Sequence, residues 1–194
     1  MEKAEARALI KSRIQSLTSE EREQKDQAIR EQLLNLTAFR EAGSVMLFVS
    51  LPDEASTRAL IRDALKLGKT VALPKVVERE GALLAARFSA SAALSRGPYG
   101  IYEPITDETI PSADLDFILV PARAFDRRGN RLGRGKGYYD RFLSRLAQRT
   151  IKCVVGYDCQ LLEEVPHDAD DAPVDLVVTE SGIIEPSGDS RARV

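Results

Sequence analysis

Residues 45–74, with the sequence VMLFVSLPDEASTRALIRDALKLGKTVALP, decide the fold class of this chain. Two apolar runs in this segment, 45–49 and 70–74, have the length of strands that are buried on both faces of a sheet. Between them, residues 54–67 place apolar side chains at helical spacing, and Gly68 ends the pattern. The segment therefore predicts two parallel strands that are joined by a crossover helix.

Similar apolar runs continue toward the C-terminus. Residues 116–120, 151–156 and 174–178 predict three more buried strands, and residues 82–88 predict a weaker one. A helix predicted over 138–147 separates two of them. Strands that alternate with helices in this way are typical of an α/β fold whose mainly parallel sheet is covered on both faces.

Two helices are predicted ahead of the first strand. Residues 2–17 have an amphipathic pattern whose inward side would carry Leu9, Ile10, Ile14 and Leu17. Thr18 and Glu21 fit a capping box, so a second helix should begin there and run to about Phe39. Its inward residues would be Ile29, Leu33, Leu34 and Leu36.

The composition is that of an ordinary globular protein. Of 194 residues, 43% are hydrophobic and 30% are charged, which excludes bulk disorder and fibrous repeats. No apolar run approaches the ~20 residues that span a bilayer, and the charged start lacks the apolar segment of a secretory signal. Cys153, Cys159 and His167 are too few for a disulfide framework or a Cys/His zinc site. We expect a cytoplasmic protein with a single domain over residues 1–194 and a frayed tail from about residue 186.

The formal net charge of −2 conceals a strong asymmetry along the chain. Residues 123–149 contain nine basic residues and two acids, whereas residues 160–180 contain seven acids and no lysine or arginine. A basic segment followed by an acidic one suits a site that binds phosphate together with Mg²⁺. The alternative is that the two segments are solvated faces.

The sequence GNRLGRGKGYYD, residues 129–140, carries the most specific chemistry. Gly133, Gly135 and Gly137 alternate just ahead of a predicted helix, so their N–H groups can turn toward an anion, which a helix N-terminus also favours. Arg134 and Lys136 stand between the glycines and add positive charge. The spacing fits neither a Walker A loop nor a dinucleotide fingerprint. It predicts a phosphate cradle, with a flexible connecting loop as the alternative.

Three carboxylates are candidates to act beside this loop. Asp140 lies one helical turn beyond it and could reach a metal held by phosphates, or could complement the helix dipole. Asp175 begins an otherwise apolar strand, where either a shared divalent cation or a contact at the strand end would explain it. Glu54 follows the first strand at its carboxyl end, where α/β sheets bind ligands, or it begins a helix. Lys3 and Arg7 could add cations for phosphates or form a solvated helix face.

Several segments together form a signature that extends over nearly the whole chain. The most specific is GNRLGRGKGYYDRFL at 129–143, preceded by Val-Pro and Ala-Phe-Asp within 120–126. The others are FVSLPDEASTRALI (48–61), GKTVALPKV (68–76), GPYGIYEP (97–104), DAPVDLVVTE (171–180) and the pair Lys3 and Arg7. In this order they resemble the 5-formyltetrahydrofolate cyclo-ligases, also called 5,10-methenyltetrahydrofolate synthetases.

The resemblance implies a three-layer α/β/α domain that uses ATP and Mg²⁺ to cyclise 5-formyltetrahydrofolate to 5,10-methenyltetrahydrofolate. It implies catalytic roles for Arg134 and Lys136 and a Mg²⁺ site at Asp140 and Asp175. The implied ATP-binding residues are Lys3, Arg7, Arg131, Leu132, Gly133, Arg134, Gly135, Lys136, Gly137, Tyr138 and Tyr139. The implied folate-binding residues are Val49, Glu54, Arg134, Gly135, Lys136, Gly137 and Tyr138.

The chain departs from the family pattern at one place. Where the family has His-Asp before a proline, this chain has Asp170 and Asp171, and its only histidine is His167. Two other classes remain open. A sugar-phosphate or acyl-CoA enzyme on a related α/β fold would need neither ATP nor the aspartate pair, and a nucleic-acid-binding module would use the basic segment. We expect small-molecule substrates, no nucleic-acid or membrane partner, and a monomer.

Overall fold

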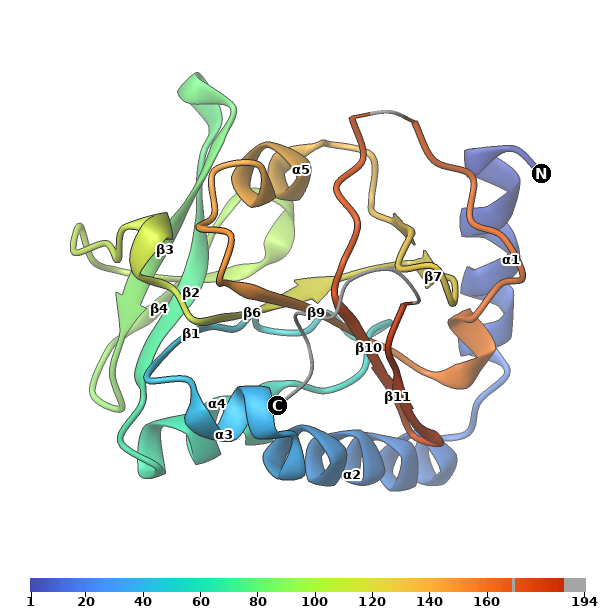
Figure 1. Ribbon diagram of the computed structural model, residues 1–194, viewed down its shortest axis with the longest axis horizontal. Coiled ribbons are helices and arrows are strands. Elements are labelled where there is room, and N and C mark those ends of the chain that lie inside the picture. The colour runs from blue at the N-terminus through green and yellow to red at the C-terminus, as the bar shows by residue number, and fades with distance from the viewer. Residues whose placement is uncertain (169, 187–194) are drawn as a thin grey trace.

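The computed structural model of the protein describes residues 1–168 and 170–186, whose course is shown in Figure 1. The tail that was expected to fray lies, from residue 187 on, outside the described residues. The α-helices in the described part of the chain are α1 (Lys3–Gln15), α2 (Ser19–Asn35), α3 (Thr37–Glu41), α4 (Arg58–Lys66) and α5 (Tyr138–Leu143). Short 3-10 turns are η1 (Glu78–Glu80), η2 (Pro98–Gly100), η3 (Ser112–Asp114) and η4 (Asp158–Gln160).

A seven-stranded sheet forms the centre of the molecule. Its strands are β1 (Ser44–Met46), β2 (Thr70–Val77), β3 (Ala82–Phe88), β6 (Phe117–Pro121), β9 (Ile151–Val155), β10 (Leu176–Thr179) and β11 (Gly182–Ile184). Their order is β11-β10-β9-β6-β1-β2-β3, in which the five central strands are parallel and the two outer strands are antiparallel. The prediction of an α/β fold with a mainly parallel sheet is therefore confirmed.

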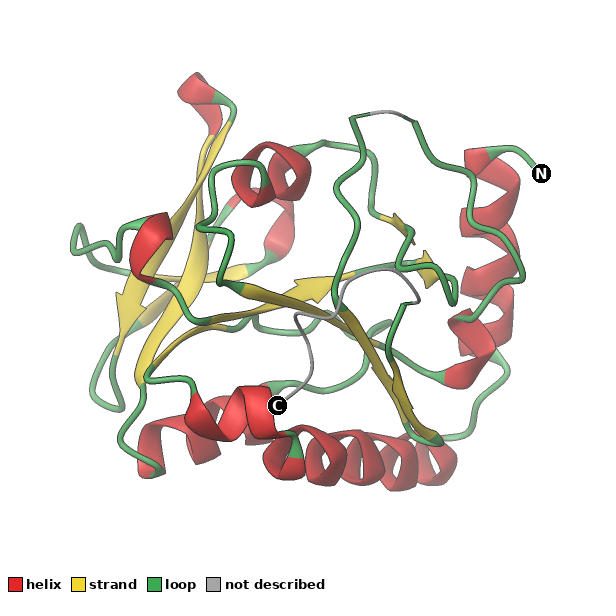
Figure 2. Ribbon diagram, viewed as in Figure 1, coloured by secondary structure: helices red, strands yellow, loops and turns green. Residues whose placement is uncertain are grey.

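The sheet is covered on both faces, which gives the three layers of an α/β/α arrangement (Figures 1 and 2). Side chains alternate along each strand, so Val45 and Leu47 join the apolar cluster that includes helices α1 to α4, whereas Met46 joins the cluster of the other face. On that second face Phe142 and Leu143 of α5 complete the core. Both clusters consist of fully or nearly fully buried residues, as the continuous apolar runs predict.

The two N-terminal helices follow the sequence pattern with two corrections. The capping box is formed, because Thr18 Oγ1 accepts from the Glu21 N–H and Glu21 Oε2 accepts from the Thr18 N–H. Leu9 is 38% exposed rather than inward, since Ala6, Ile10 and Ile14 occupy the buried stripe. The second helix ends at Asn35, because Leu36 is extended at ψ 121° and separates α2 from α3.

Two further helix boundaries also differ from the prediction. The helix expected from residue 54 begins only at Arg58, because residues 50–57 form a loop in which Thr57 Oγ1 accepts from the Ser50 N–H at 3.1 Å and donates to the Phe48 carbonyl. The helix expected to reach residue 147 ends at Leu143. Glu54 is consequently a loop residue and not part of a first helical turn.

Two small ribbons lie beside the carboxyl edge of the sheet. Strand β4 (Leu94–Arg96) pairs with β5 (Tyr102–Pro104), and β7 (Ala124–Phe125) pairs with β8 (Arg131–Leu132). The β7–β8 ribbon carries the chain from β6 into the glycine loop. Within the described residues, no helix has the length and apolarity needed to cross a membrane.

Candidate active site

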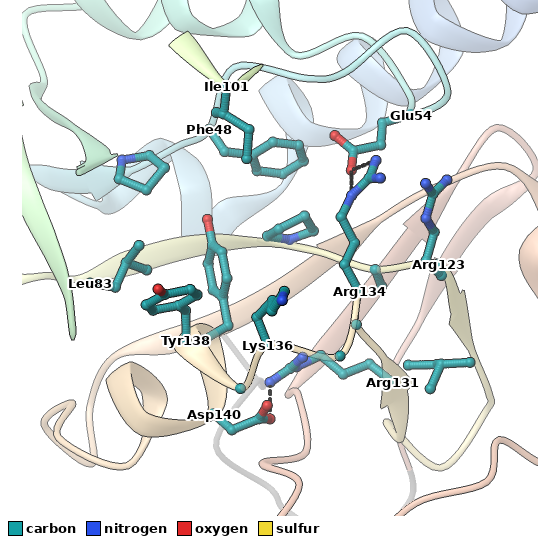
Figure 3. Close-up of a pocket in the computed structure, with 18 of the residues that line it drawn as sticks. Phe48, Glu54, Leu83, Ile101, Arg123, Arg131, Arg134, Lys136, Tyr138 and Asp140 are labelled. Atoms are coloured by element: carbon teal, nitrogen blue, oxygen red, sulfur yellow. Dashed lines mark hydrogen bonds and ion pairs between the residues drawn. The ribbon is translucent and has the colours of Figure 1, made fainter. Parts of the chain in front are cut away.

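A pocket of about 460 Å³ opens at the carboxyl ends of β1, β2 and β6 (Figure 3). This is the edge at which parallel α/β sheets bind ligands. Apolar side chains, among them Phe48, Leu83 and Ile101, gather on one side of it, and Glu54 and Arg134 face each other on another. The pocket therefore combines a wall suited to a flat ring with a strongly charged wall.

Nearly all of the residues that the sequence singled out line this pocket. They are Lys3, Arg7, Val49, Glu54, Arg131, Leu132, Gly133, Arg134, Gly135, Lys136, Gly137, Tyr138, Tyr139 and Asp140. They come from α1, from the loop after β1, from β8, from the glycine loop at 133–137 and from the start of α5. Segments more than 120 residues apart in sequence thus meet at one place, as the carboxyl-edge argument predicts; for example, Arg7 Nε donates to the Gly133 carbonyl.

Asp175 is the exception, and its placement corrects the metal prediction. It lies just before β10, at the opposite edge of the parallel strands, and it does not line the pocket. Its Oδ2 accepts from the Lys152 N–H at 2.8 Å, and its Oδ1 lies 3.6 Å from Lys152 Nζ. The contact at the strand end, which the sequence left as the alternative, explains this charge without a metal.

The glycine loop has the backbone conformation that its sequence suggests. Gly135 at φ +91° and Gly137 at φ +66° are both in the left-handed region, where side chains with a Cβ are strained. A Cβ on Gly137 would lie 2.8 Å from Arg141 Nη1, and one on Gly135 would lie 3.2 Å from Arg7 Nη2. Arg7 Nε donates to the Gly133 carbonyl at 2.9 Å, so α1 is held against the loop.

Four alternating charges form a chain beside the pocket, and three of them, Glu54, Arg123 and Arg134, line it. Arg134 Nη2 donates to Glu54 Oε1 and to Asp53 Oδ1, each at 2.8 Å, and Arg123 Nη2 lies 2.5 Å from Asp53 Oδ2. Burial acts to raise the pKa of Asp53, but the hydrogen bonds from Arg134 and Arg123 outweigh it and hold this pKa below its usual value. Asp53 is therefore firmly ionised and shared by two guanidinium groups.

The loop that carries Glu54 is supported from behind by α2. Arg22 Nη2 donates to the Pro52 carbonyl at 2.5 Å and to the Glu54 carbonyl at 3.2 Å. Asp26 Oδ1 accepts from the Ser56 N–H at 2.9 Å. Glu54 Oε2 accepts from the Leu51 N–H at 2.9 Å, so the carboxylate is oriented by its own loop and only its Oε1 side faces Arg134.

A second group of ion pairs lies on the side of the pocket near α1 and α5. Arg131, whose side chain is 3% exposed, is paired with Asp140 Oδ1. Lys3 Nζ lies 2.7 Å from Asp168 and 2.6 Å from Asp171. Every one of these cations has a carboxylate partner, so an incoming anion would exchange with carboxylates already in place.

Three tyrosines lie in or beside the site: Tyr138 and Tyr139 begin α5, and Tyr99 lies in η2. The Tyr138 hydroxyl lies 3.3 Å from that of Tyr99, and Lys136 Nζ lies 5.7 Å from the centre of the Tyr99 ring. Tyr99 is the only non-glycine residue with a positive φ, +63°, in the described part of the chain. The Tyr139 hydroxyl is buried and has no hydrogen-bond partner in the part of the chain that the structure describes, and this burial raises the pKa of Tyr139 above the ordinary range.

Sequence reasoning missed five charged residues of this region: Asp53, Glu103, Arg123, Asp168 and Asp171. Glu103 is 6% exposed, lines the pocket and accepts from the Val76 N–H at 3.3 Å, and burial raises its pKa. Asp53 is the immediate neighbour of Glu54, and Asp171 lies in the acidic segment that the charge asymmetry indicated. The adjacency to Glu54 and the acidic segment were visible in the sequence, but they did not show which of several neighbouring acids would reach the pocket.

The residues of the pocket suit a magnesium ion that is bound together with phosphates. Asp140 and Asp171 line the same part of the pocket, and the N–H of Ala172 lies 3.4 Å from Asp140 Oδ1. Among described residues no group of three or more His, Cys, Asp or Glu could hold a metal. Mg²⁺ is usually bound by one or two carboxylates and by substrate phosphates, so two carboxylates beside a phosphate cradle fit it.

Comparisons with known proteins identify the family of the chain. The family model for 5-formyltetrahydrofolate cyclo-ligases matches residues 1–180. The 5-formyltetrahydrofolate cyclo-ligase of Mus musculus is 30% identical, with 90% of this chain and 91% of the relative covered, and that of Haemophilus influenzae is 33% identical, with 84% and 90% covered. The solved structure of Aquifex aeolicus 5,10-methenyltetrahydrofolate synthetase is 36% identical and has a TM-score of 0.86 over 97% of this chain and 95% of that one. On the strength of this match the chain belongs to the 5-formyltetrahydrofolate cyclo-ligase family.

Proposed function

We propose that this protein converts 5-formyltetrahydrofolate to 5,10-methenyltetrahydrofolate at the expense of ATP, with Mg²⁺ as cofactor. The observation that supports this most is the pocket itself, in which the cationic glycine loop and the carboxylate of Glu54 face one cavity with an apolar wall. We take residues 1–194 to act as one such domain, as a cytoplasmic monomer that works on small molecules. A sugar-phosphate enzyme would have no use for an apolar wall beside Glu54.

The chemistry requires an oxygen to become a leaving group. The formyl oxygen attacks the γ-phosphorus of ATP and ADP departs, which turns a poor leaving group into a phosphate ester. The folate N10 then attacks the activated carbon, its proton is lost and inorganic phosphate leaves, which closes the methenyl bridge. Phosphoryl transfer of this kind needs positioning and neutralisation of charge more than a protein nucleophile.

The residues of the pocket can be assigned roles in these two steps. Lys3, Arg7, Arg131 and the N–H groups of residues 131–139 would hold the phosphates of ATP. Lys136 would stay with the γ-phosphoryl group, and Arg134 would contact the oxygen that joins it to the formyl carbon. Asp140, with Asp171 in place of Asp175, would hold Mg²⁺, which when bound neutralises part of the triphosphate charge.

The folate would lie against the apolar wall near Val49, with its pterin ring directed to Glu54. A carboxylate accepts hydrogen bonds from two neighbouring N–H groups, which is the donor pattern of the 2-amino group and N3–H of a pterin ring. The flat ring would be flanked by Tyr138 and by the side of the pocket that holds Phe48 and Leu83.

The direct test is an absorbance assay of methenyltetrahydrofolate formation. We expect product to appear only when 5-formyltetrahydrofolate, ATP and Mg²⁺ are all present. Thermal shift with each component gives an independent view, since a ligand that binds the folded state raises Tm. If DNA raises Tm and Mg-ATP does not, the nucleic-acid alternative is favoured instead.

Replacing Glu54 with glutamine tests the assignment of the folate edge. The amide keeps the size of the side chain but replaces one acceptor with a donor, so it cannot accept from two N–H groups at once. We expect KM for 5-formyltetrahydrofolate to rise by tenfold or more while KM for ATP changes less than threefold. An equal rise in both constants would mean that Glu54 acts only on the shape of its loop.

A further inference from the structure

The proposed function places two demands on the same pair of side chains. Glu54 must accept hydrogen bonds from the folate ring, and Arg134 must reach an oxygen of the transferred phosphoryl group. In the structure, however, Arg134 occupies Glu54 Oε1 with both Nε, at 3.2 Å, and Nη2, at 2.8 Å. The second oxygen of Glu54 accepts from the Leu51 N–H, which leaves it one acceptor position, whereas the two bonds from Arg134 fill Oε1. Folate can therefore engage Glu54 fully only if Arg134 gives up Oε1.

Asp53 determines where the Arg134 guanidinium lies after folate has displaced it from Glu54. Its Oδ1 accepts from Arg134 Nη2 at 2.8 Å, and this contact does not involve the oxygen that folate would take. Arg134 is 38% exposed, so without a second anchor it would leave the wall for solvent. With Asp53 in place, the guanidinium stays at the pocket. The N–H groups that it had donated to Glu54, one on Nε and one on Nη2, then become free to bind an anion.

Arg123 explains why Asp53 can serve as this anchor. Its Nη2 lies 2.5 Å from Asp53 Oδ2, and its side chain is 13% exposed. This pair orients Asp53 so that Oδ1 faces Arg134, and it offsets one of the two adjacent negative charges of residues 53 and 54. Asp53 therefore holds Arg134 more weakly than an unpaired carboxylate would, which leaves the arginine able to contact phosphate.

We propose that Asp53 is a positioning residue that couples the two substrates: when folate displaces Arg134 from Glu54, Asp53 retains the guanidinium at the pocket wall, where its freed N–H groups bind a phosphate oxygen of ATP. This inference rests on the proposed function. Its consequence is that folate increases the affinity for ATP and, by reciprocity of binding free energies, ATP increases the affinity for folate to the same degree. ATP alone meets an arginine that is still engaged by both carboxylates.

The test is a calorimetric titration of β,γ-imido-ATP with Mg²⁺, in the absence and in the presence of saturating 5-formyltetrahydrofolate. In the wild-type protein we expect folate to tighten binding of the analogue at least fivefold, the lower end of ordinary coupling between sites. In Asp53→Asn the gain should fall below twofold, while folate binding alone changes less than threefold. Asp53→Glu, which keeps the charge, should restore part of the gain.

Asp63→Asn is the matched control. Asp63 also forms an aspartate–arginine pair, with Arg30 Nε at 2.5 Å, but it lies in α4 and outside the pocket. This variant should keep the wild-type gain, and circular dichroism with thermal melts establishes that each variant is folded. If Asp53→Asn does not fold, Arg134→Lys replaces it, because a lysine cannot hold Asp53 and a phosphate in the same fork, and its gain should also be lost.

The outcomes separate this inference from the function on which it rests. A wild-type protein that forms methenyl product but binds the analogue equally, or more weakly, with folate present overturns the coupling and leaves the proposed function standing. If folate still tightens binding of the analogue at least fivefold in Asp53→Asn, the coupling does not depend on Asp53. A protein that binds neither substrate overturns both.

Discussion

We expect replacement of Lys136 with alanine to lower kcat by about 10²–10³-fold, whereas the affinity for ATP should fall far less. Lys136 stands between two glycines in the left-handed region, Gly135 and Gly137, so its backbone is held by the loop. Its ammonium lies 5.7 Å from the Tyr99 ring, and among described residues no carboxylate pairs with it. Such a cation can follow the charge that moves to the transferred phosphoryl group, and it therefore acts mainly in the transition state.

The measurement combines steady-state formation of the methenyl product with direct titration of ATP. Lys11→Ala is a suitable control, because Lys11 is exposed on α1 and does not line the pocket. It should leave both quantities unchanged. If Lys136→Ala turns over at the wild-type rate, or if it loses only ATP binding, the glycine loop is a passive anion cradle and the catalytic role of Lys136 is wrong.

Replacing Asp140 with asparagine is expected to reduce both stability and turnover. Arg131 is 3% exposed and has Asp140 as its carboxylate partner, so the variant leaves a buried guanidinium without its paired carboxylate. Removal of one partner of a buried pair costs ~3–5 kcal/mol, and because Asp140 is 23% exposed we expect about 3 kcal/mol, measured by urea unfolding. The Mg²⁺ concentration for half-maximal rate should also rise about tenfold, because one carboxylate charge is removed from the metal.

Asp175→Asn separates the metal effect from a general effect on the fold. Asp175 pairs with Lys152 at the far edge of the sheet, where both side chains are partly exposed, so we expect a loss of about 1 kcal/mol and an unchanged Mg²⁺ requirement. A Mg²⁺ requirement that shifts in Asp175→Asn and not in Asp140→Asn would reverse our assignment of the metal site.

Much of the fold was predictable because local and long-range signals agree. The runs at 45–49 and 116–120 are apolar on both faces, and only a strand in the middle of a covered parallel sheet buries both. The capping box at Thr18 and Glu21 is a local device whose partners are three residues apart, so tertiary context hardly alters it. The glycine loop was recognisable for the same reason, since its conformation depends on residues within the loop.

The errors arise where tertiary contacts decide between neighbouring residues. Leu9 and Ala6 both fit one side of a helix, and packing of α1 against η4 and β7 selects the smaller alanine. Asp171 and Asp175 both belong to an acidic segment, but a turn places one at the pocket while the strand carries the other to the opposite edge. Asp53 and Arg123 form an ion pair although they are 70 residues apart in sequence, and no local sequence pattern predicts such a pair.

The ion pairs of Lys3 have a consequence for how the molecule is assembled. They join α1 to residues that lie 165 and 168 positions later in the chain. Contacts across such a separation close a very long loop, so they become favourable only after the strands between them have paired. Folding should therefore proceed from the sheet outward, with docking of α1 onto the glycine loop among its last events. Folding intermediates that lack the docked helix would have an open pocket without Lys3 and Arg7. Binding of ATP would therefore distinguish the fully folded protein from such intermediates.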